Sequence, residues 1–169
     1  ISAPRRGCLL VATPQLEDPN FWRSVILIID HGSEGSLGVI LNRPSEISVD
    51  QIVPGWAASS SSAPRVFSGG PVQTNSLVAL ALASAPLRGA TSVTEHFALL
   101  NLVEEPDIAQ QDFGNVCLYL GYSGWSPGQL QAELQEGAWR TFESKPEDLI
   151  SDPIDSWTRV LRRQNSAAR

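Results

Sequence analysis

The stretch NVCLYLGYSGWSPGQLQAEL, residues 115–134, decides the fold class because it places a strand directly before a helix. Its first part, Asn115–Tyr122, is apolar and rich in strand-forming side chains, which predicts a buried strand. A corner follows, in which Ser126 takes the N-cap, Pro127 the first helical position and Gln129 the third. This spacing is that of a capping box with proline where its missing N–H has no cost.

The chain before this stretch predicts strands joined by short connections. Gly7–Thr13 is short, apolar and β-rich, and Arg23–Asp30 is apolar almost throughout, as expected for a strand covered on both faces. Leu37–Asn42 returns after the Gly/Ser-rich loop His31–Ser36, which predicts an antiparallel pair. Further strands are predicted at Arg65–Ser68, Leu77–Ala83, Phe97–Val103 and Ala138–Glu143, and short helices at Ser48–Trp56, before Gly137, at Ser144–Ile150 and after Asp155.

This order predicts a single α+β domain over residues 1–169. We expect a mixed, largely antiparallel sheet, curved or barrel-like, with flanking helices. A regular βαβ wind is disfavoured because residues 7–56 offer too little helix. Residues 57–64 (AASSSSAP) predict a mobile surface loop, and residues 164–169 a frayed tail.

Composition excludes several classes of protein. The longest apolar run, Val25–Ile29, is far shorter than the ~20 residues of a membrane span, and no signal segment is evident, so we expect a cytoplasmic protein. Cys8 and Cys117 lie in apolar runs, which predicts buried, reduced thiols. The net charge of −6 opposes non-specific DNA binding. Because the chain starts at Ile1 and lacks Met, we expect residues upstream of it.

The corner also contains a partial match to a nucleophile elbow, which requires Gly-x-Ser-x-Gly at a strand-to-helix turn. After Gly121-Tyr122-Ser123-Gly124 the fifth position is Trp125, and both histidines of the chain, His31 and His96, come earlier. The order of a serine hydrolase of that class places His last, so this chemistry is set aside. The N–H groups at the helix start could instead bind a carboxylate or phosphate, unless Ser126 already satisfies them as an N-cap.

The first predicted hairpin contains a second polar group of interest. Asp30 and His31 end one strand, and Asn42 and Arg43 are expected opposite them, in one polar cluster. Such a cluster could perform acid–base chemistry or tie the loop by hydrogen bonds. The glycines of the loop lack the helix and Lys of a phosphate loop, and no cysteine or helical His pair completes a zinc site.

These stretches together resemble the YqgE/AlgH family of bacterial proteins. The specific motifs are NRP at Asn42–Pro44, GGPV at Gly69–Val72 and GWSPGQL at Gly124–Leu130, within matching segments that span nearly the whole chain. The resemblance implies an α+β fold with a barrel-like mixed sheet, in the cytoplasm. It implies no settled activity: members are commonly labelled uncharacterised or regulators of transcription. The family often has Ala at the position of Ser123, which argues further against a nucleophile there.

Three hypotheses follow. The first is a non-enzymatic binding or regulatory domain, acting indirectly through a small anionic ligand or a protein partner, with no cofactor or metal. The second is an enzyme of unassigned type with an anion site near His31 and Arg43. The third is direct nucleic-acid binding through the arginine-rich ends, Arg5–Arg6 and Arg159–Arg163, which the acidic charge disfavours. The ligand-facing residues expected in the first hypothesis are His31, Asn42, Arg43, Ser68, Gly69, Gly70, Gly124, Trp125, Ser126 and Gly128.

Overall fold

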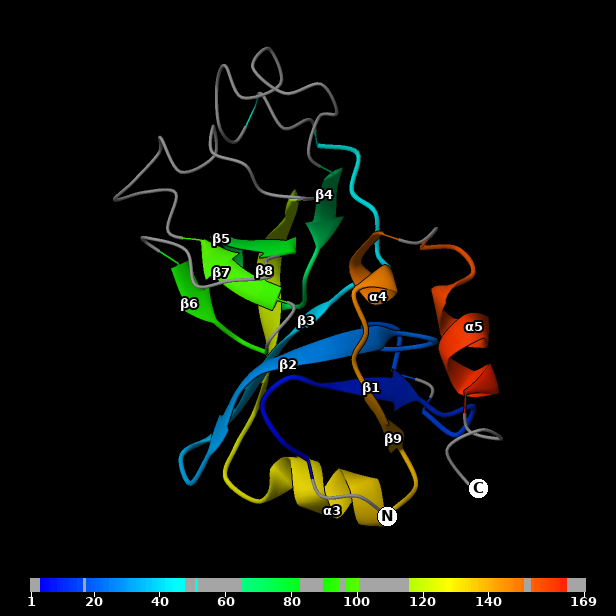
Figure 1. Ribbon diagram of the computed structural model, residues 1–169. Helices are drawn as coiled ribbons and strands as arrows, with labels where there is room; N and C mark the ends of the chain where they lie inside the picture. The colour runs from blue at the N-terminus through cyan, green and yellow to red at the C-terminus, as the bar shows by residue number, and fades with distance from the viewer. Residues whose placement is uncertain are drawn as a thin grey trace.

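The computed structural model describes residues 4–16, 18–47, 51, 65–82, 90–94, 97–100, 116–150 and 153–163. Its strands form one nine-stranded sheet in the order β6-β7-β5-β8-β3-β2-β1-β9, with β4 against β8. The sheet curls into a half-barrel with helices packed on it, so the expected α+β class is confirmed (Figure 1). The strands are β1 (Cys8–Ala12), β2 (Val25–Gly32), β3 (Gly35–Ile40), β4 (Arg65–Ser68), β5 (Val72–Leu82), β6 (Ala90–Ser92), β7 (Phe97–Leu100), β8 (Val116–Trp125) and β9 (Trp139–Glu143), and the helices are α3 (Gln129–Gln135), α4 (Glu147–Ile150) and α5 (Ser156–Arg162).

Strand β1 and the first half of β2, Val25–Ile28, are buried on both faces, whereas the second half of β2 is partly exposed, so the predicted cover of Arg23–Asp30 is confirmed only in part. In β1, Leu9 and Val11 join one core cluster, which also holds Leu149 of α4 and Val160 of α5. The alternate residues Cys8, Leu10 and Ala12 join a second cluster with Leu130 and Leu134 of α3. Successive side chains of a strand point to opposite faces, so α3 covers one face and α4 with α5 the other.

The hairpin of β2 and β3 is tighter than the sequence predicts, because both strands continue into the expected loop. His31 pairs with Ser36 and Gly32 with Gly35, which leaves only residues 33 and 34 in the turn. In an antiparallel pair the end of one strand lies beside the start of the other. Asn42 therefore lies beside Val25 and not beside His31, and the expected polar cluster of Asp30, His31, Asn42 and Arg43 does not form.

Strand β4 enters the sheet between β8 and the chain that follows β3. It runs parallel to β8, with Val66 opposite Leu118, and on its other side the Ser68 N–H donates to the Arg43 carbonyl at 2.8 Å. The glycines after β4 then pack against the backbone of β8. Gly70 has φ +153, and a Cβ there would lie 2.6 Å from the Ser123 nitrogen. No side chain fits at this position, which explains the Gly-Gly pair.

The corner after β8 differs from the predicted capping box. The helix begins at Gln129, and the residue before it is Gly128, with φ 79 and no side-chain cap hydrogen bond. Half of the box is present, because Oε1 of Gln129 accepts the Ser126 N–H at 2.9 Å. Positive φ favours glycine, so Gly128 and not Ser126 shapes the entry. Gly137 ends α3 as predicted, with the paired Ala138-to-Glu133 and Gly137-to-Leu134 bonds of a Schellman motif.

The C-terminal helices lie close to the predicted positions. Asp155 precedes α5 as its N-cap, but its side chain makes no cap hydrogen bond. The predicted helix at Ser48–Trp56, apart from residue 51, and the predicted loop and tail at 57–64 and 164–169 lie outside the described residues. Within the part of the chain that the structure describes, no helix is long and apolar enough to cross a membrane.

Candidate functional site

The connection between β1 and β2 is a compact turn that points one aromatic side chain inward and the next outward. Its start is fixed by Asp18, whose carbonyl accepts the N–H groups of Phe21 and Trp22 at 3.0 and 2.8 Å. The Phe21 ring packs against the indoles of Trp125 and Trp139, with centroids 6.4 and 5.7 Å away. Trp22 is 51% exposed. The partly buried Phe21 thus anchors a turn that presents Trp22 to solvent.

Asn42 holds the end of this turn. Its Oδ1 accepts the Val25 N–H and its Nδ2 donates to the Arg23 carbonyl, both at 2.9 Å. The amide therefore satisfies one donor and one acceptor of the backbone just where β2 begins, and it is buried. Arg23 takes a left-handed conformation with φ 56, which is unusual for a residue other than glycine. Such conformations persist only where the surroundings fix them.

Arg43 adds a second restraint from the same motif. Its Nη2 donates to the carbonyl of Trp22. Trp22 directly precedes Arg23, whose carbonyl is bound by Asn42. The guanidinium is partly buried, and this burial lowers the pKa of Arg43 from its usual value. Asn42 and Arg43 together bind two successive carbonyls of the turn. The NRP motif thus positions Trp22 and Arg23.

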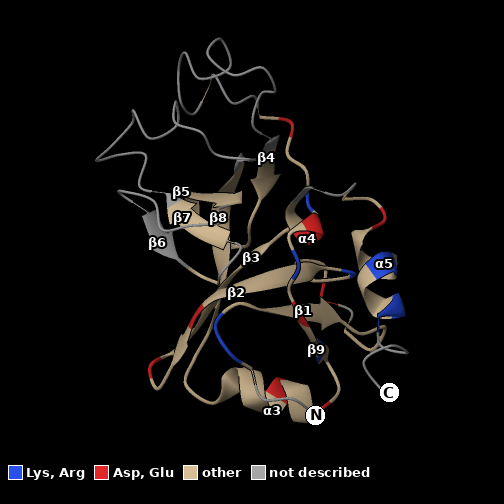
Figure 2. Ribbon diagram, in the orientation of Figure 1, with Lys and Arg blue, Asp and Glu red and all other residues tan. Residues whose placement is uncertain are grey.

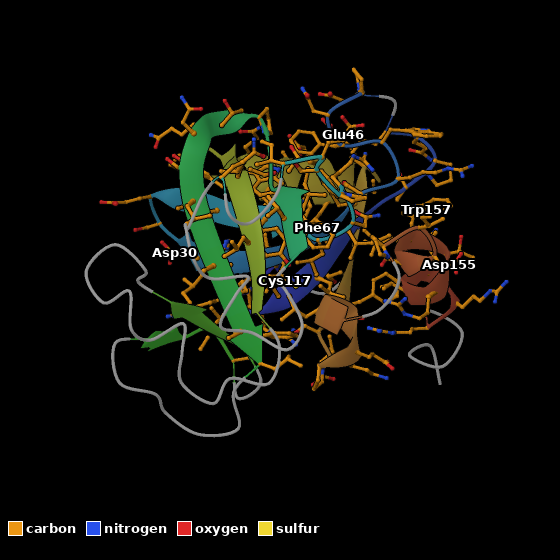
Figure 3. All side chains as sticks on the ribbon, turned by 90° about the horizontal axis from the view of Figure 1, so that it is seen from above. Asp30, Glu46, Phe67, Cys117, Asp155 and Trp157 are labelled. Carbon is orange, nitrogen blue, oxygen red and sulfur yellow. The ribbon has the colours of Figure 1, made fainter. Side chains whose placement is uncertain are left out.

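The guanidinium of Arg23 lies between two indole rings. Its Cζ is 4.7 Å from the centroid of Trp22 and 4.9 Å from that of Trp157, within the range of cation–π attraction. Trp157 is itself fixed, because its Nε1 donates to the Ala12 carbonyl at 2.7 Å. Figure 3 shows Trp157 on the side of α5 that faces the turn. We call Trp22, Arg23, Arg43 and Trp157 the Arg23 surface.

The charges of the Arg23 surface are not neutralised by described residues. Neither Arg23 nor Arg43 forms a salt bridge in the part of the chain that is described, whereas Arg159 and Arg163 both do. Arg23 is exposed and its side chain donates no hydrogen bond to a described residue. This arrangement suits an anion, because arginine stays protonated and keeps its N–H donors.

The ten residues predicted to face a ligand fall into separate groups. Asn42, Arg43 and Ser68 lie where β4 meets the chain after β3. Gly69 and Gly70 are buried against β8, where the Gly69 carbonyl accepts the Ile40 N–H at 2.9 Å.

The third group lies at the hairpin and the corner. His31 bonds to Ser36, and Ser36 pairs with Trp125. The group consists of His31, Gly124, Trp125, Ser126 and Gly128.

The first and third groups are too far apart for one small-ligand pocket. Arg43 lies seven residues beyond Ser36 along the chain, which is extended through β3 as far as Ile40, so their separation is up to about 23 Å. In Figure 3, Asp30 of the hairpin and Trp157 of the Arg23 surface lie on opposite sides of the molecule. A single pocket formed by all ten residues is therefore not supported, and their roles as ligand-binding residues stay a prediction.

The polar atoms at the corner bind one another. Oε1 of Glu133 accepts the indole N–H groups of Trp125 and Trp139 at 3.1 and 2.8 Å, and its Oε2 accepts from Gln129 at 2.8 Å. The hydroxyl of Ser123 is buried and donates to the Gly69 carbonyl at 3.4 Å. The corner thus forms a connected structural network around Glu133.

The residues of the two other hypotheses also have clear positions. Nδ1 of His31 hydrogen-bonds to Oγ of Ser36 at 2.6 Å, at the end of the hairpin far from Arg43, so one site with both residues is not supported. Arg163 binds the buried carboxylate of Asp148, and Arg159 lies 3.7 Å from the same carboxylate. These two arginines of the C-terminal end are therefore partly neutralised within the protein. Figure 2 marks the basic residues of α5 in blue and the acidic residues of the hairpin in red along the ribbon.

Metal and thiol chemistry find little support in the described residues. No group of three or more His, Cys, Asp or Glu side chains among them could hold a metal ion. Cys8 and Cys117 are buried, as predicted. Burial raises the pKa of the Cys8 thiol, which keeps it in the neutral form.

Sequence reasoning missed Trp22, Arg23 and Trp157 as candidate binding residues. A signal for the first two was present: Phe21, Trp22 and Arg23 follow directly on the turn-forming Asp18-Pro19-Asn20. Two adjacent aromatic residues at the end of a turn cannot both be buried easily. Trp157 carried no separate signal, because its position in α5 fits an ordinary helix face.

Comparison with known proteins places the chain in a family. The family model described as AlgH-like matches residues 9–169. The chain belongs to the AlgH-like family. A UPF0301 protein of Streptomyces avermitilis is 45% identical to this AlgH-like chain over 168 residues, covering 95% of this chain and 86% of the relative. A UPF0301 protein of Thermobifida fusca is 40% identical over 170 residues, covering 94% and 86%.

Two solved structures share the AlgH-like fold. A crystal structure of a Corynebacterium diphtheriae protein is 30% identical, with a TM-score of 0.86, and covers 96% of this chain and 88% of that one. The solution structure of AlgH from Pseudomonas aeruginosa is 28% identical, with a TM-score of 0.71, and covers 100% and 91%. The YqgE/AlgH resemblance and the fold it implies are confirmed. The names of these proteins state no activity.

Proposed function

We propose that this AlgH-like chain is a non-enzymatic binding domain of the bacterial cytoplasm, with a regulatory role exerted through a bound anion or a protein partner. The binding site in this proposal is the Arg23 surface. The observation that carries it is the exposed, left-handed Arg23, held between two indoles and without an ion pair among the described residues. Functional sites often lie on such restrained loops.

The chemistry of the surface supports binding in preference to catalysis. The titratable groups of the Arg23 surface are two arginines, which do not give up a proton near neutral pH. His31, which could act as a general base, lies at the far end of the hairpin. An arginine beside exposed aromatic rings is instead typical of recognition surfaces.

The test is a panel of anions measured against matched arginine variants. We expect at least one carboxylate or phosphate compound to raise the unfolding temperature of the wild type by mass action. Arg23→Gln should abolish this shift. Arg5→Gln removes the same charge at the opposite end of β1, before Cys8, and should respond like the wild type.

Two results would count against the proposal. An identical response of Arg23→Gln and wild type would remove the Arg23 surface as the site. Conversion of any panel compound to a product, lost in a His31→Ala variant, would replace the binding domain with the enzyme hypothesis.

A further inference from the structure

Resting on the proposed function, we propose that the occupant of the Arg23 surface is a carboxylate of a protein segment, an Asp or Glu side chain flanked by apolar residues. The inference concerns which anion fits and what carries it. It draws on the contacts of Arg23 with the two indoles, on the local charge and on the exposed apolar area around Arg23.

The guanidinium of Arg23 keeps hydrogen-bond donors for a ligand. The Cζ atom of Arg23 lies over both rings, 4.7 Å from the centroid of Trp22 and 4.9 Å from that of Trp157. The N–H donors of a guanidinium point outward in its plane. No described residue accepts a hydrogen bond from this side chain. A planar carboxylate matches these donors, because arginine binds carboxylates through two parallel hydrogen bonds.

The local charge favours a carboxylate over a phosphate. A phosphate monoester carries about −1.5 to −2 charges near neutral pH and is usually bound by several donors or cations. Here Arg23 is the exposed cation of the surface, since Arg43 is partly buried and donates to the Trp22 carbonyl. The whole chain has a net charge of −6, and exposed Asp18 and Asp155 lie close in sequence to Trp22 and Trp157. The negative potential of the chain repels a carboxylate, with its single charge, less than a phosphate monoester.

The surroundings favour a protein segment as the carrier. Trp22 is 51% exposed, and Ile154, three residues before Trp157, is 84% exposed. Exposed aromatic and aliphatic area beside an arginine is the composition of protein interfaces. The turn is already fixed by Asn42 and Arg43, so binding orders few further side chains. An acidic residue with apolar neighbours can bind Arg23 through its carboxylate while its neighbours pack on the exposed apolar side chains beside Arg23.

The experiment uses three peptides that differ at one position. Acetyl-Gly-Trp-Glu-Leu-Gly-amide is titrated into the full-length ¹⁵N-labelled chain in the low-millimolar range, beside peptides with Gln or phosphoserine in place of Glu. The indole N–H signals report the site. Those of Trp22 and Trp157 should shift, while those of Trp125 and Trp139, bound to Glu133, should stay. The Gln peptide should bind at least about tenfold more weakly, since it lacks the charge-assisted pair.

Variants of Arg23 separate charge from geometry. Arg23→Gln should lower the affinity for the Glu peptide at least about tenfold. Arg23→Lys should have an affinity between those of the wild type and Arg23→Gln, because lysine keeps the charge but lacks the planar guanidinium. Arg5→Gln should bind like the wild type. Unchanged Trp125 and Trp139 signals in each variant show that the fold is intact.

The results distinguish this inference from the proposed function. Tighter Arg23-dependent binding of the phosphoserine peptide would overturn the carboxylate inference and leave the binding function in place. If no peptide shifts the Trp22 and Trp157 signals while the anion panel still acts through Arg23, the protein segment is ruled out as carrier. If the binding of neither the peptides nor the anions depends on Arg23, both proposals fail.

Discussion

At the scale of single residues, Asn42 is the clearest case of a polar side chain that replaces backbone pairing. Its amide binds the Val25 N–H and the Arg23 carbonyl where β2 starts, and its side chain is buried. A buried backbone group that loses its partner costs about 1–3 kcal/mol. The asparagine of the NRP motif is therefore explained by the fold and needs no ligand.

Replacement of Asn42 should be strongly destabilising. We expect Asn42→Ala to lower the free energy of unfolding by about 2–4 kcal/mol, because one donor and one acceptor are left without partners. Urea unfolding followed by circular dichroism measures it. Asn75→Ala, at an exposed position of β5, is the control and should change stability by less than about 0.5 kcal/mol. A similar small change for Asn42→Ala would refute its structural role.

Cys8 should make the free energy of unfolding depend on pH in the alkaline range. Burial raises the pKa of its thiol above the ordinary value of 9.0, so the unfolded chain loses the proton first as pH rises. The contribution of Cys8 to stability is full below pH 9.0 and is lost as pH rises through the higher folded-state pKa. Urea unfolding at neutral pH and at about pH 10 should show this loss. Cys8→Ala should show a smaller decrease between the two conditions, and an equal decrease would disprove the assignment.

At the scale of elements, one carboxylate of α3 adds hydrogen bonds to the apolar packing of this helix on the sheet. Glu133 accepts both indole N–H groups of Trp125, at the end of β8, and Trp139, at the start of β9. The helix connects these two strands in the chain, so Glu133 joins all three elements. The indoles also contact each other and Phe21, with centroids 5.9 Å apart between the two tryptophans.

Removal of this carboxylate should loosen the corner. Glu133→Ala leaves two largely buried indole donors unpaired, and we expect a loss of about 2–4 kcal/mol. Near-ultraviolet circular dichroism should also change, because it reports the packing of the tryptophans. Glu136→Ala removes the same charge from the exposed end of α3 and serves as the control. Equal effects of the two variants would show that helix charge, and not the indole bonds, is responsible.

At the scale of the whole molecule, the two halves of the sheet meet where Gly69 and Gly70 cross β8. A Cβ at Gly70 would overlap the Tyr122 carbonyl and lie 2.6 Å from the Ser123 nitrogen. Because backbone atoms form this contact, no side-chain movement can relieve it. The GGPV and GYSG segments, distant in sequence, are therefore explained by one close approach of two backbones.

Gly70→Ala should disturb the sheet junction. We expect a loss of about 3 kcal/mol or more, from overlap together with the left-handed φ of +153. The thermal unfolding midpoint of the purified variant measures it. Gly32→Ala is the matched control, since no atom lies within 4 Å of its added Cβ. A variant at position 70 as stable as this control would contradict the described packing.

The sequence predicted the features that depend on local order. The two-sided burial of Val25–Ile28 in β2, the helix end at Gly137 and the buried thiols follow from side-chain period, backbone freedom and apolar context. The predicted start of α3 was displaced because Gly128, and not Ser126, adopts the conformation that the entry requires.

Only the tertiary structure decided how remote segments meet. The partner of Asn42 depends on which end of the β2–β3 hairpin lies beside Asn42. The pairing of β4 with β8 is not indicated by the hydrophobic pattern of either strand. The Arg23 surface is the extreme case, since Arg23 and Trp157 lie near opposite ends of the chain. Periodicity fixes which face of an element is apolar, but the sheet order and the packing of α5 on β1 determine which exposed residues become neighbours.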